Sequence, residues 1–573
     1  MLALIVRTTY GALHCGEHYS AGVIRPSRVW IRHRQPIVWT TTGLLTSDVM
    51  RSDARYTANP SAVEGWQLRQ VTAPSRLFGA NGLRTGPDGR VYVAQVTGSQ
   101  ISALNVDTGQ VDTVSAKGGD IVAPDDVAFD AHGHLYATEV MDGRVSVRET
   151  NGSTRVLRDD VPSANGITFH HGRLFVGECR EGGRLMEFDL GGGPPRILLD
   201  NVPSPNAMEV GPDGLLYFPV MGANEIWRID LAGGEPQVVT SGLGVPDAVK
   251  FDAEGFIVST QVASGQVLRI DPRTGEQTVL AQLTPGLDNL TFVGDRLFVS
   301  NFTGEITEIC ATGPTTVLAG GLNWPLDLTV APDGSLYIAD GTYFYRVGRS
   351  GLETVGMLFS PGYPGFLRGM TTSAPGEFVV TTAGDTVARY RPATAETVVL
   401  ASGVDQPYGV ALAPDGTPVV VEQGTGRLLA VRDGAVDVLA AGLERPVGVA
   451  FGPDGAPLVS VAGAVVGVGG SGVLVDGLDT PQGILVRDHV LYIVDAGSKE
   501  LVSVDLDTGA RGVIACGLPV GPPPGVVPKP LRGMPPFSGP QGPFAGITAG
   551  ADGTLYVSAD GDGSVLALRR VAP

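Results

Sequence analysis

The sequence predicts an all-β protein built from twelve four-stranded blades, a β-propeller, and three observations support this. First, one unit recurs along the chain, most often at steps of about 38 to 42 residues, which is the spacing of a propeller blade. Second, each unit contains short apolar runs separated by turn signals such as Pro-Asp-Gly. Third, no apolar period typical of a helix competes with this pattern.

The repeated unit is clearest in the copy that starts at Pro246. Its four expected strands are Ala248–Phe251, Phe256–Ser259, Gly265–Ile270 and Glu276–Leu280. In the turns between such strands, Pro pre-sets the backbone angle φ and Gly accepts the positive φ that other residues resist. The units begin near Ala80, Pro124, Ala164, Pro205, Pro246, Leu287, Pro325, Leu367, Pro407, Pro446, Pro481 and Phe544.

The last unit ends at Val571 after only three expected strands. The segment Trp66–Val71, just before the first unit, reads as a fourth strand without a blade. Pairing this segment into the incomplete blade would close a ring and hide a strand edge. In the alternative arrangement, each blade takes its outer strand from the preceding unit, and the sequence leaves both arrangements open.

The repeat pattern divides the chain into three parts. Residues 1–64 hold no repeat and carry seven Arg within the first sixty residues, so we expect a poorly ordered extension, with Met50 as an alternative start. Residues 65–324 form the expected first six-bladed propeller, and residues 325–573 the second. The Pro- and Gly-rich segment 517–543 is expected to be an irregular loop, either a tolerated surface insertion or a cap.

Composition excludes several classes of protein. A hydrophobic share of 43% argues against disorder, and a formal net charge of −19 argues against nucleic acid as a partner. No apolar run is long enough to cross a membrane, and the start of the chain lacks a signal-peptide pattern, so a cytoplasmic location is expected. The four cysteines are far apart in the sequence and fit neither a zinc pattern nor a disulfide framework.

The residues that open the first strand of each blade should form a ring around the channel of a propeller. In the second half these residues share no chemistry: Leu326, Arg368, Tyr408, Val447, Gln482 and Ala545. In the first half all six carry side-chain oxygen: Asn81, Asp125, Asn165, Asn206, Asp247 and Asp288. This contrast favours two separate channels, hence two rings of six blades, with a single twelve-bladed ring as the alternative.

Three carboxylates and three amides around one channel suit a hard cation that prefers oxygen ligands. A second polar position, at the end of the second strand, holds Glu139 and Glu178 together with Gln95, Gln261 and Asn301, and is expected to form a neighbouring layer. Asn and Asp also cap loop ends by bonding to nearby backbone, which is the structural alternative for each of these residues.

At these residues the sequence resembles the senescence marker protein/gluconolactonase/regucalcin family of six-bladed propellers. The resemblance lies in Pro246-Asp247-Ala-Val-Lys-Phe-Asp-Ala-Glu-Gly255, in Ser204-Pro-Asn206-Ala and in Ala164-Asn165-Gly. It implies a divalent metal in the channel, bound by Asn165, Asn206 and Asp247, with Asp247 also the general base. The family's remaining ligand is a Glu, and Asn81 stands in its place. This departure removes one negative charge, for which Asp125 or Asp288 would have to compensate.

The resemblance implies a metal-dependent hydrolase that acts on a lactone or related ester as its small-molecule substrate. The expected cofactor is one divalent ion, Ca²⁺ first, with Mg²⁺, Mn²⁺ or Zn²⁺ as alternatives. We expect Asp247 to be catalytic and Asn81, Asn165, Asn206 and Asp247 to bind the metal. Residues expected to contact substrate are Asn165, Asp125, Asp288, Glu139 and Glu178.

Two other functions remain open at this stage. The second half shares only the general blade pattern, which also resembles NHL-type repeats and streptogramin B lyases. A lyase of that type would need a channel His and Glu, and no His occupies a channel position. The other alternative is a non-enzymatic platform, with a protein partner bound through the second propeller, because fold alone does not specify function.

Overall fold

The computed structural model describes residues 55–571, except 433, 471 and 536, and all of these belong to one compact unit. Within these residues no α-helix forms. Two single turns of 3₁₀ helix occur, Met221–Ala223 and Pro392–Thr394. No helix of the described part is long and apolar enough to cross a membrane. The predicted extension lies mostly outside the described residues, as does Met50.

The strands of the first half form six four-stranded antiparallel sheets. In chain order these sheets are β3–β6 (Leu83–Thr85, Val91–Gln95, Gln100–Leu104, Val111–Ser115), β7–β10 (Pro124–Phe129, Leu135–Glu139, Arg144–Arg148, Thr154–Arg158), β11–β14 (Ala164–His170, Arg173–Glu178, Gly183–Phe188, Arg196–Val202), β15–β18 (Glu209–Val210, Leu215–Val220, Glu225–Asp230, Gln237–Thr240), β19–β22 (Pro246–Phe251, Ile257–Gln261, Gln266–Ile270, Gln277–Gln282) and β23–β26 (Leu287–Val293, Arg296–Asn301, Ile306–Cys310, Gly313–Leu318).

The second half forms six further sheets. The first four are β27–β30 (Asp327–Val330, Leu336–Asp340, Tyr343–Gly348, Gly351–Met357), β31–β34 (Leu367–Ala374, Glu377–Thr382, Val387–Arg391, Glu396–Ala401), β35–β38 (Pro407–Leu412, Pro418–Glu422, Arg427–Arg432, Ala435–Ala441) and β39–β42 (Val449–Phe451, Pro457–Val461, Ala464–Gly467, Gly472–Val475). The last two are β43–β46 (Pro481–Arg487, Val490–Asp495, Glu500–Asp505, Arg511–Cys516) with β1 (Ser61–Ala62) added at the edge, and β47–β49 (Ile547–Ala549, Leu555–Ala559, Ser564–Arg570) with β2 (Trp66–Thr72).

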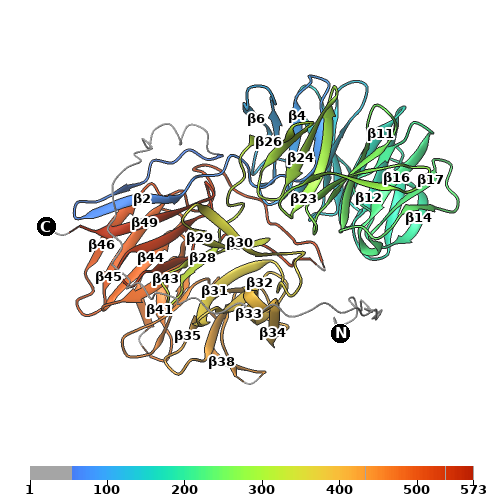
Figure 1. Ribbon diagram of the computed structural model, residues 1–573. Helices are drawn as coiled ribbons and strands as arrows, with labels where there is room; N and C mark the ends of the chain where they lie inside the picture. Colours follow the sequence, from blue (N-terminus) through green and yellow to red (C-terminus); the bar gives the residue numbers. More distant parts are fainter. Residues whose placement is uncertain (1–54, 433, 471, 536, 572–573) are drawn as a thin grey trace, which may run out of the picture. The chain divides into compact units, whose positions relative to one another are not determined.

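Contacts between inner strands close two separate rings. The first strands of the first six sheets touch in the cycle β3, β7, β11, β15, β19, β23 and back to β3. Those of the second six touch in the cycle β27, β31, β35, β39, β43, β47 and back to β27. The predicted fold, two propellers of six blades each, is confirmed, and Figure 1 shows the strands of each half gathered in their own group.

The N-terminal strand β2 completes the last blade of the second ring. It pairs antiparallel with β49, from Trp66 opposite Arg570 to Thr72 opposite Val565. The structure therefore has the first of the two closing arrangements that the sequence left open. The predicted first propeller, residues 65–324, included this strand, and the pairing assigns it instead to the second ring. The reason is that β49 would otherwise leave an unpaired edge.

The Pro-Asp-Gly turns form as their residue types predict. In the turn between β15 and β16, Asp213 Oδ1 accepts a hydrogen bond of 3.1 Å from the backbone N–H of Leu215, and Gly214 adopts a φ of +80°. This positive φ favours glycine because it has no Cβ. The side chain of the turn Asp thus bonds to backbone two residues later, which fixes the link between first and second strands.

A second requirement for glycine arises where inner strands approach each other. The N–H of Gly82 donates a hydrogen bond of 2.7 Å to the carbonyl oxygen of Asp125 on the next blade. A Cβ placed on Gly82 would lie 2.4 Å from that oxygen. Close contact between the first two blades at the channel therefore needs glycine directly after the channel residue Asn81.

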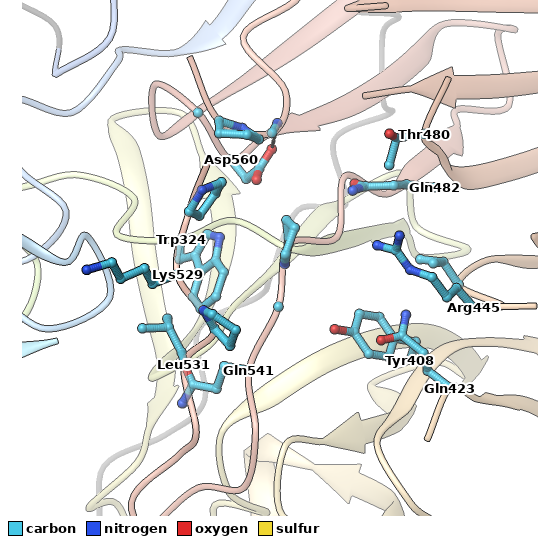
Figure 2. A pocket seen from close by; sticks show the side chains of 18 of the residues that line it. Trp324, Tyr408, Gln423, Arg445, Thr480, Gln482, Lys529, Leu531, Gln541 and Asp560 are labelled. Carbon is cyan, nitrogen blue, oxygen red and sulfur yellow. Dashed lines mark hydrogen bonds between the residues drawn. The ribbon is translucent and has the colours of Figure 1, made fainter. Parts of the chain in front are cut away.

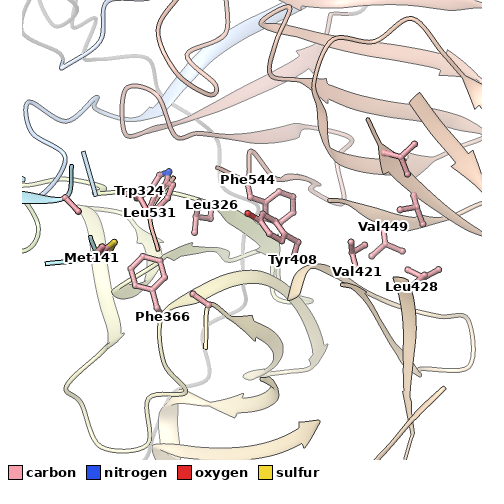
Figure 3. Packing of buried hydrophobic residues seen from close by; sticks show 14 of the residues in the cluster. Met141, Trp324, Leu326, Phe366, Tyr408, Val421, Leu428, Val449, Leu531 and Phe544 are labelled. Atoms are coloured by element: carbon pink, nitrogen blue, oxygen red, sulfur yellow. The ribbon is translucent and has the colours of Figure 1, made fainter. Parts of the chain in front are cut away.

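Apolar side chains of adjacent blades pack face to face and form the cores. One larger cluster combines residues of both rings: Met141 and Val140 of the first, with Leu326 and Phe366 of the second and Trp324 between β26 and β27 (Figure 3). Leu531 and Phe544, which lie between β46 and β47, also belong to this cluster. The segment that links β46 and β47 is therefore packed into the protein on its apolar side.

Candidate active site in the first channel

The six oxygen-bearing residues predicted from the sequence line one narrow cavity of about 110 Å³ in the first ring. Each lies at or just before the start of an inner strand. Asp125, Asn165, Asp247 and Asp288 are the second residues of their strands, while Asn81 and Asn206 precede theirs. All except Asn81 are at least nine-tenths buried. The repeat therefore brings side chains from six different blades to one place.

The amide groups hold two of the carboxylates in place. Asn206 Nδ2 donates a hydrogen bond of 3.0 Å to Asp247 Oδ2, and Asn81 Nδ2 donates one of 3.0 Å to Asp288 Oδ2. The amide oxygens are in turn fixed by backbone: Asn206 Oδ1 accepts from the N–H of Ala207, and Asn81 Oδ1 from that of Val96. Each amide thus orients one carboxylate toward the cavity.

The electrostatics of the cavity disfavour three negative charges. Burial, and then the nearby Asp126, raise the pKa of Asp125 to about 7. Burial raises the pKa of Asp247 and Asp288 well above the ordinary value, and repulsion among the carboxylates raises both further. Within the described part of the chain, no Lys, Arg or His forms an ion pair with these three groups. A bound cation would supply the missing positive charge.

The donor set fits a hard divalent cation when amide oxygens are included. Carboxylates and amide carbonyls are the protein ligands that Ca²⁺ and Mg²⁺ prefer. No group of three His, Cys, Asp or Glu side chains in the described residues is arranged for metal binding by itself. Asn165 and Asn206 would therefore have to contribute, beside Asp247. Sulfur side chains, which favour soft metal ions over Ca²⁺ and Mg²⁺, also line the cavity: Met141, Cys179, Met221 and Met534.

Two carboxylates predicted to contact substrate lie outside this cavity. Glu139 is fully buried and accepts hydrogen bonds from Ser146, from the N–H of Val122 and from Arg144 Nη2 at 2.6 Å. Glu178 is also fully buried and holds Arg180 and Arg184 together with the N–H of Arg184. Their oxygens are used by the protein itself, so the structure does not bring these two residues to the predicted site.

The position that Glu139 and Glu178 share has a structural role that recurs in both rings. It lies at the end of the second strand, and its side chain usually fixes nearby loop backbone. Gln95 accepts from the N–H of Phe78, Gln261 from Gly244, Glu422 from Asp405, and Asp340 from both Asn323 and Trp324. The side chains predicted to form a second polar layer therefore anchor loops. Sequence spacing gave their position along the strand, but it did not give their hydrogen-bond partners.

This role predicts the outcome of replacing Glu178 by Ala. The change removes the acceptor of the Arg184 N–H and of two guanidinium groups, and should cost about 1–3 kcal/mol of unfolding free energy. Catalytic constants should change little. Urea denaturation and steady-state kinetics on the same preparation test this. A raised KM at unchanged stability would contradict it and return Glu178 to the substrate site.

Sequence reasoning missed a second layer of charged residues deeper in the same channel. Arg84 Nη1 lies 2.8 Å from Glu209 Oε2, and Lys250 Nζ lies 3.2 Å from the same oxygen. Arg84 also donates to the carbonyls of Val127 and Ile167 on two other blades. A signal was present, because these three residues stand three positions after Asn81, Asn206 and Asp247. The pairing of β19 with β20 shifts register between Pro246 and Val249, so a side chain three positions after the channel residue faces the channel again.

Asp126 and Asn289 were also missed. Asp126 accepts from the N–H groups of Val127 and Ile167, and Asn289 Oδ1 accepts from that of Leu290. Burial raises the pKa of Asp126, whereas Arg84 and Lys250 act to lower it. Asn289 Nδ2 also donates a hydrogen bond of 3.4 Å to Asp126 Oδ1, so both residues lie beside the charged layer of Arg84 and Lys250.

The channel of the second ring is filled differently. Arg368 is almost completely buried, lies 4.1 Å from the centroid of the Tyr408 ring and donates to the carbonyls of Pro407 and Pro540. Arg368 is therefore part of the packing of this channel. A larger pocket of about 470 Å³ lies beside it, lined by Tyr408, Gln482, Arg445 and Trp324 among others (Figure 2).

Part of the chain is similar to a known family. Residues 27–303 match the model described as SMP-30/Gluconolactonase/LRE-like region. The match spans the first five blades of the first propeller and the first two strands of the sixth, β23 and β24. The resemblance predicted from Asn165, Asn206 and Asp247 is thereby confirmed, and the protein contains a lactonase-like propeller. The match leaves most of the second propeller uncovered.

Solved structures of similar fold align with about half of this chain. A streptogramin B lyase is 18% identical, with a TM-score of 0.37, and the alignment covers 50% of this chain and 98% of that one. Virginiamycin B lyase from Staphylococcus aureus is 17% identical (TM-score 0.36, 48% and 96% covered). The gluconolactonase XC5397 from Xanthomonas campestris is 16% identical (TM-score 0.35, 44% and 94% covered). No curated protein matches the chain.

Proposed function

We propose that the first channel is the active site of a hydrolase that opens a lactone or a related ester. The observation that carries this proposal is the convergence of Asp125, Asp247 and Asp288 with three Asn side chains in one buried cavity. The family match over this ring supports the reaction class. None of the histidines in the described residues lines the cavity, which disfavours a His-dependent elimination here.

In this proposal a divalent cation, when bound, polarises the substrate carbonyl and makes a nearby water more acidic. Asn165, Asn206 and Asp247 would hold it, with Asn81 at the position of the family's fourth ligand. The chain's own groups then position the reactants. Asp247, held by Asn206 Nδ2 at 3.0 Å, accepts the proton of the attacking water. Asp125 and Asp288, on two other blades of the ring, contact polar atoms of the substrate.

A hydrolysis screen tests the proposal. Wild-type protein would be incubated with γ- and δ-lactones and with aryl esters, and acid release followed by pH-stat, with and without prior chelation. We expect turnover of at least one lactone that is lost after chelation and restored by one divalent ion. Absence of turnover across lactones and esters, in protein supplied with Ca²⁺, Mg²⁺, Mn²⁺ and Zn²⁺ in turn, would contradict the proposal.

The raised pKa values predict a pH dependence of cation binding. The pKa of Asp125 is about 7, and that of Asp247 is also raised, so both acids hold their protons in the metal-free protein as pH falls below 7. A proton on Asp247 competes with the cation directly, and loss of the proton from Asp125 adds a negative charge nearby. Affinity should therefore rise between pH 6 and pH 8, by at most about tenfold per pH unit for each proton displaced. Calorimetric titration with Ca²⁺ at three pH values measures this. A pH-independent affinity would place the cation elsewhere.

A further inference from the structure

The cavity that holds the six polar residues has a second, apolar wall. Its lining includes Met141 and Phe302 of the first ring, and Phe359 and Phe366 of the second. Met534 and Phe537, from the Pro- and Gly-rich segment 517–543, complete this wall. One side of the cavity therefore offers oxygen atoms and the other offers aromatic and thioether surface. We refer to Phe302, Phe359, Met534 and Phe537 as the apolar wall.

The aromatic rings of the apolar wall contact one another across three separate parts of the chain. The ring centroids of Phe302 and Phe359 lie 6.3 Å apart with nearly parallel planes, and those of Phe359 and Phe537 lie 5.9 Å apart. All three side chains are only half-buried, and Phe302 and Phe359 pack against the edge of a core cluster. Partly exposed aromatic surface beside buried carboxylates is the arrangement expected where a ligand's apolar part covers it.

Segment 517–543 is held in place by the second ring. Arg368 Nη2 donates to the carbonyl of Pro540, and the N–H of Gly539 donates to the carbonyl of Ala383. Within the segment, backbone bridges join Leu531 to Gln541 and Met534 to Ser538. The second ring therefore anchors the segment after Met534, and the bridge from Leu531 to Gln541 ties the residues before Met534 to this anchored stretch. The irregular segment thus presents apolar side chains to the first channel.

We infer that this site selects lactones or esters that carry an apolar substituent, and that the second propeller supplies the surface that binds it. The inference rests on the proposed hydrolase function, because it concerns the substrate of that same cavity. The polar ring would receive the ester group, and the apolar wall the alkyl or aryl group beside it. A polyhydroxylated lactone would leave hydroxyl groups against Phe302 and Phe359 without hydrogen-bond partners, which is unfavourable.

A substrate series tests the inference. For wild-type protein, kcat/KM should rise from γ-butyrolactone to its γ-alkyl derivatives by about fourfold per methylene that reaches the wall, the factor equivalent to about 0.8 kcal/mol per buried CH₂. Aldonolactones of equal ring size should be poorer substrates. In Phe359→Ala and Met534→Ala the dependence on chain length should flatten, because kcat/KM for the γ-alkyl derivatives falls toward that for γ-butyrolactone in the same variant. Phe256→Ala, a half-buried aromatic outside the cavity, is the matched control.

Binding of γ-alkyl lactams, which are not hydrolysed, separates this inference from the proposed function. Calorimetry should show tighter binding with longer alkyl groups in wild type and in Phe256→Ala, and a loss of that gain in Phe359→Ala. Lactam binding with this dependence but no hydrolysis of any lactone would overturn the hydrolase and keep the apolar selectivity. Hydrolysis with no preference for alkyl substituents, or a preference unchanged in Phe359→Ala, would overturn the inference and keep the hydrolase.

Discussion

Replacing Asp247 by Asn should lower kcat/KM for lactone hydrolysis by about 10²- to 10⁴-fold, the range that a positioned general base contributes. The amide keeps the size of the side chain, but it cannot accept the proton of the attacking water. It also removes one negative ligand from a set in which Asn81 already stands where the family has Glu. Steady-state kinetics on the best lactone of the screen measures the loss.

The control for this change is Glu254→Gln, which alters a carboxylate of the same blade. Glu254 lies in the turn between β19 and β20, at the opposite end of β19 from Asp247. It is exposed and forms an ion pair of 3.4 Å with Arg269. Its replacement should leave kinetics and stability nearly unchanged, because exposed ion pairs contribute little. If Asp247→Asn retained wild-type activity with a normal melting curve, Asp247 would not be the base.

Replacing Leu68 by Asp in β2 should lower the unfolding free energy by about 2–4 kcal/mol, the cost expected when a carboxylate enters an apolar cluster without a partner. Leu68 packs against the cluster of the last two blades, which contains Leu485 and the fully buried Leu568. Its backbone pairs with that of Leu568 in the strand that closes the second ring. Chemical denaturation followed by far-ultraviolet circular dichroism gives the shift in midpoint.

The neighbouring residue provides the matched variant. Gln67 is on the same strand but is exposed, so Gln67→Asp adds the same charge without burying it. Its unfolding free energy should stay within about 0.5 kcal/mol of the wild-type value. Equal midpoints for the two variants would mean that β2 does not close the ring in solution.

Much of the fold was predictable because one unit repeats twelve times. The strands expected after Pro246 agree with β19 to β22 within two residues at each end. The pairing of the segment Trp66–Val71 was harder to predict. A strand that closes the last blade, and blades that each take their outer strand from the preceding unit, give the same apolar pattern. Only the observed pairing of β2 with β49 decides between them, and it depends on contacts nearly 500 residues apart in the sequence.

Site residues could be predicted where their position in the repeat determines which way the side chain faces. Residues that open an inner strand must face the channel, so Asp125, Asn165 and Asp247 could be placed together from sequence. Glu139 and Glu178 could not, because a carboxylate at the end of a second strand can reach either the channel or its own loop. Nearby Arg residues, Arg144 and Arg184, decide the matter through contacts that no spacing rule contains.

The apolar wall was not predictable, although segment 517–543 was recognised as unusual. Its Met534 and Phe537 stand in an irregular stretch with no strand period to give their direction. Arg368 and Ala383 of the second ring bond to the segment close to these two residues, and such contacts cannot be read from the sequence. A lactonase-like propeller sequence therefore describes half of this site, and the second ring completes it.

Metal content of the purified protein tests the central claim most directly. Wild type, Asp247→Ala and Glu254→Gln would be dialysed against Ca²⁺, passed through a desalting column and analysed by elemental mass spectrometry. The account predicts about one divalent ion per chain in wild type and in Glu254→Gln, and loss of that ion in Asp247→Ala. Wild-type protein that holds no divalent ion after exposure to Ca²⁺, Mg²⁺, Mn²⁺ or Zn²⁺, or an ion retained in full by Asp247→Ala, would contradict a cation site in the first channel.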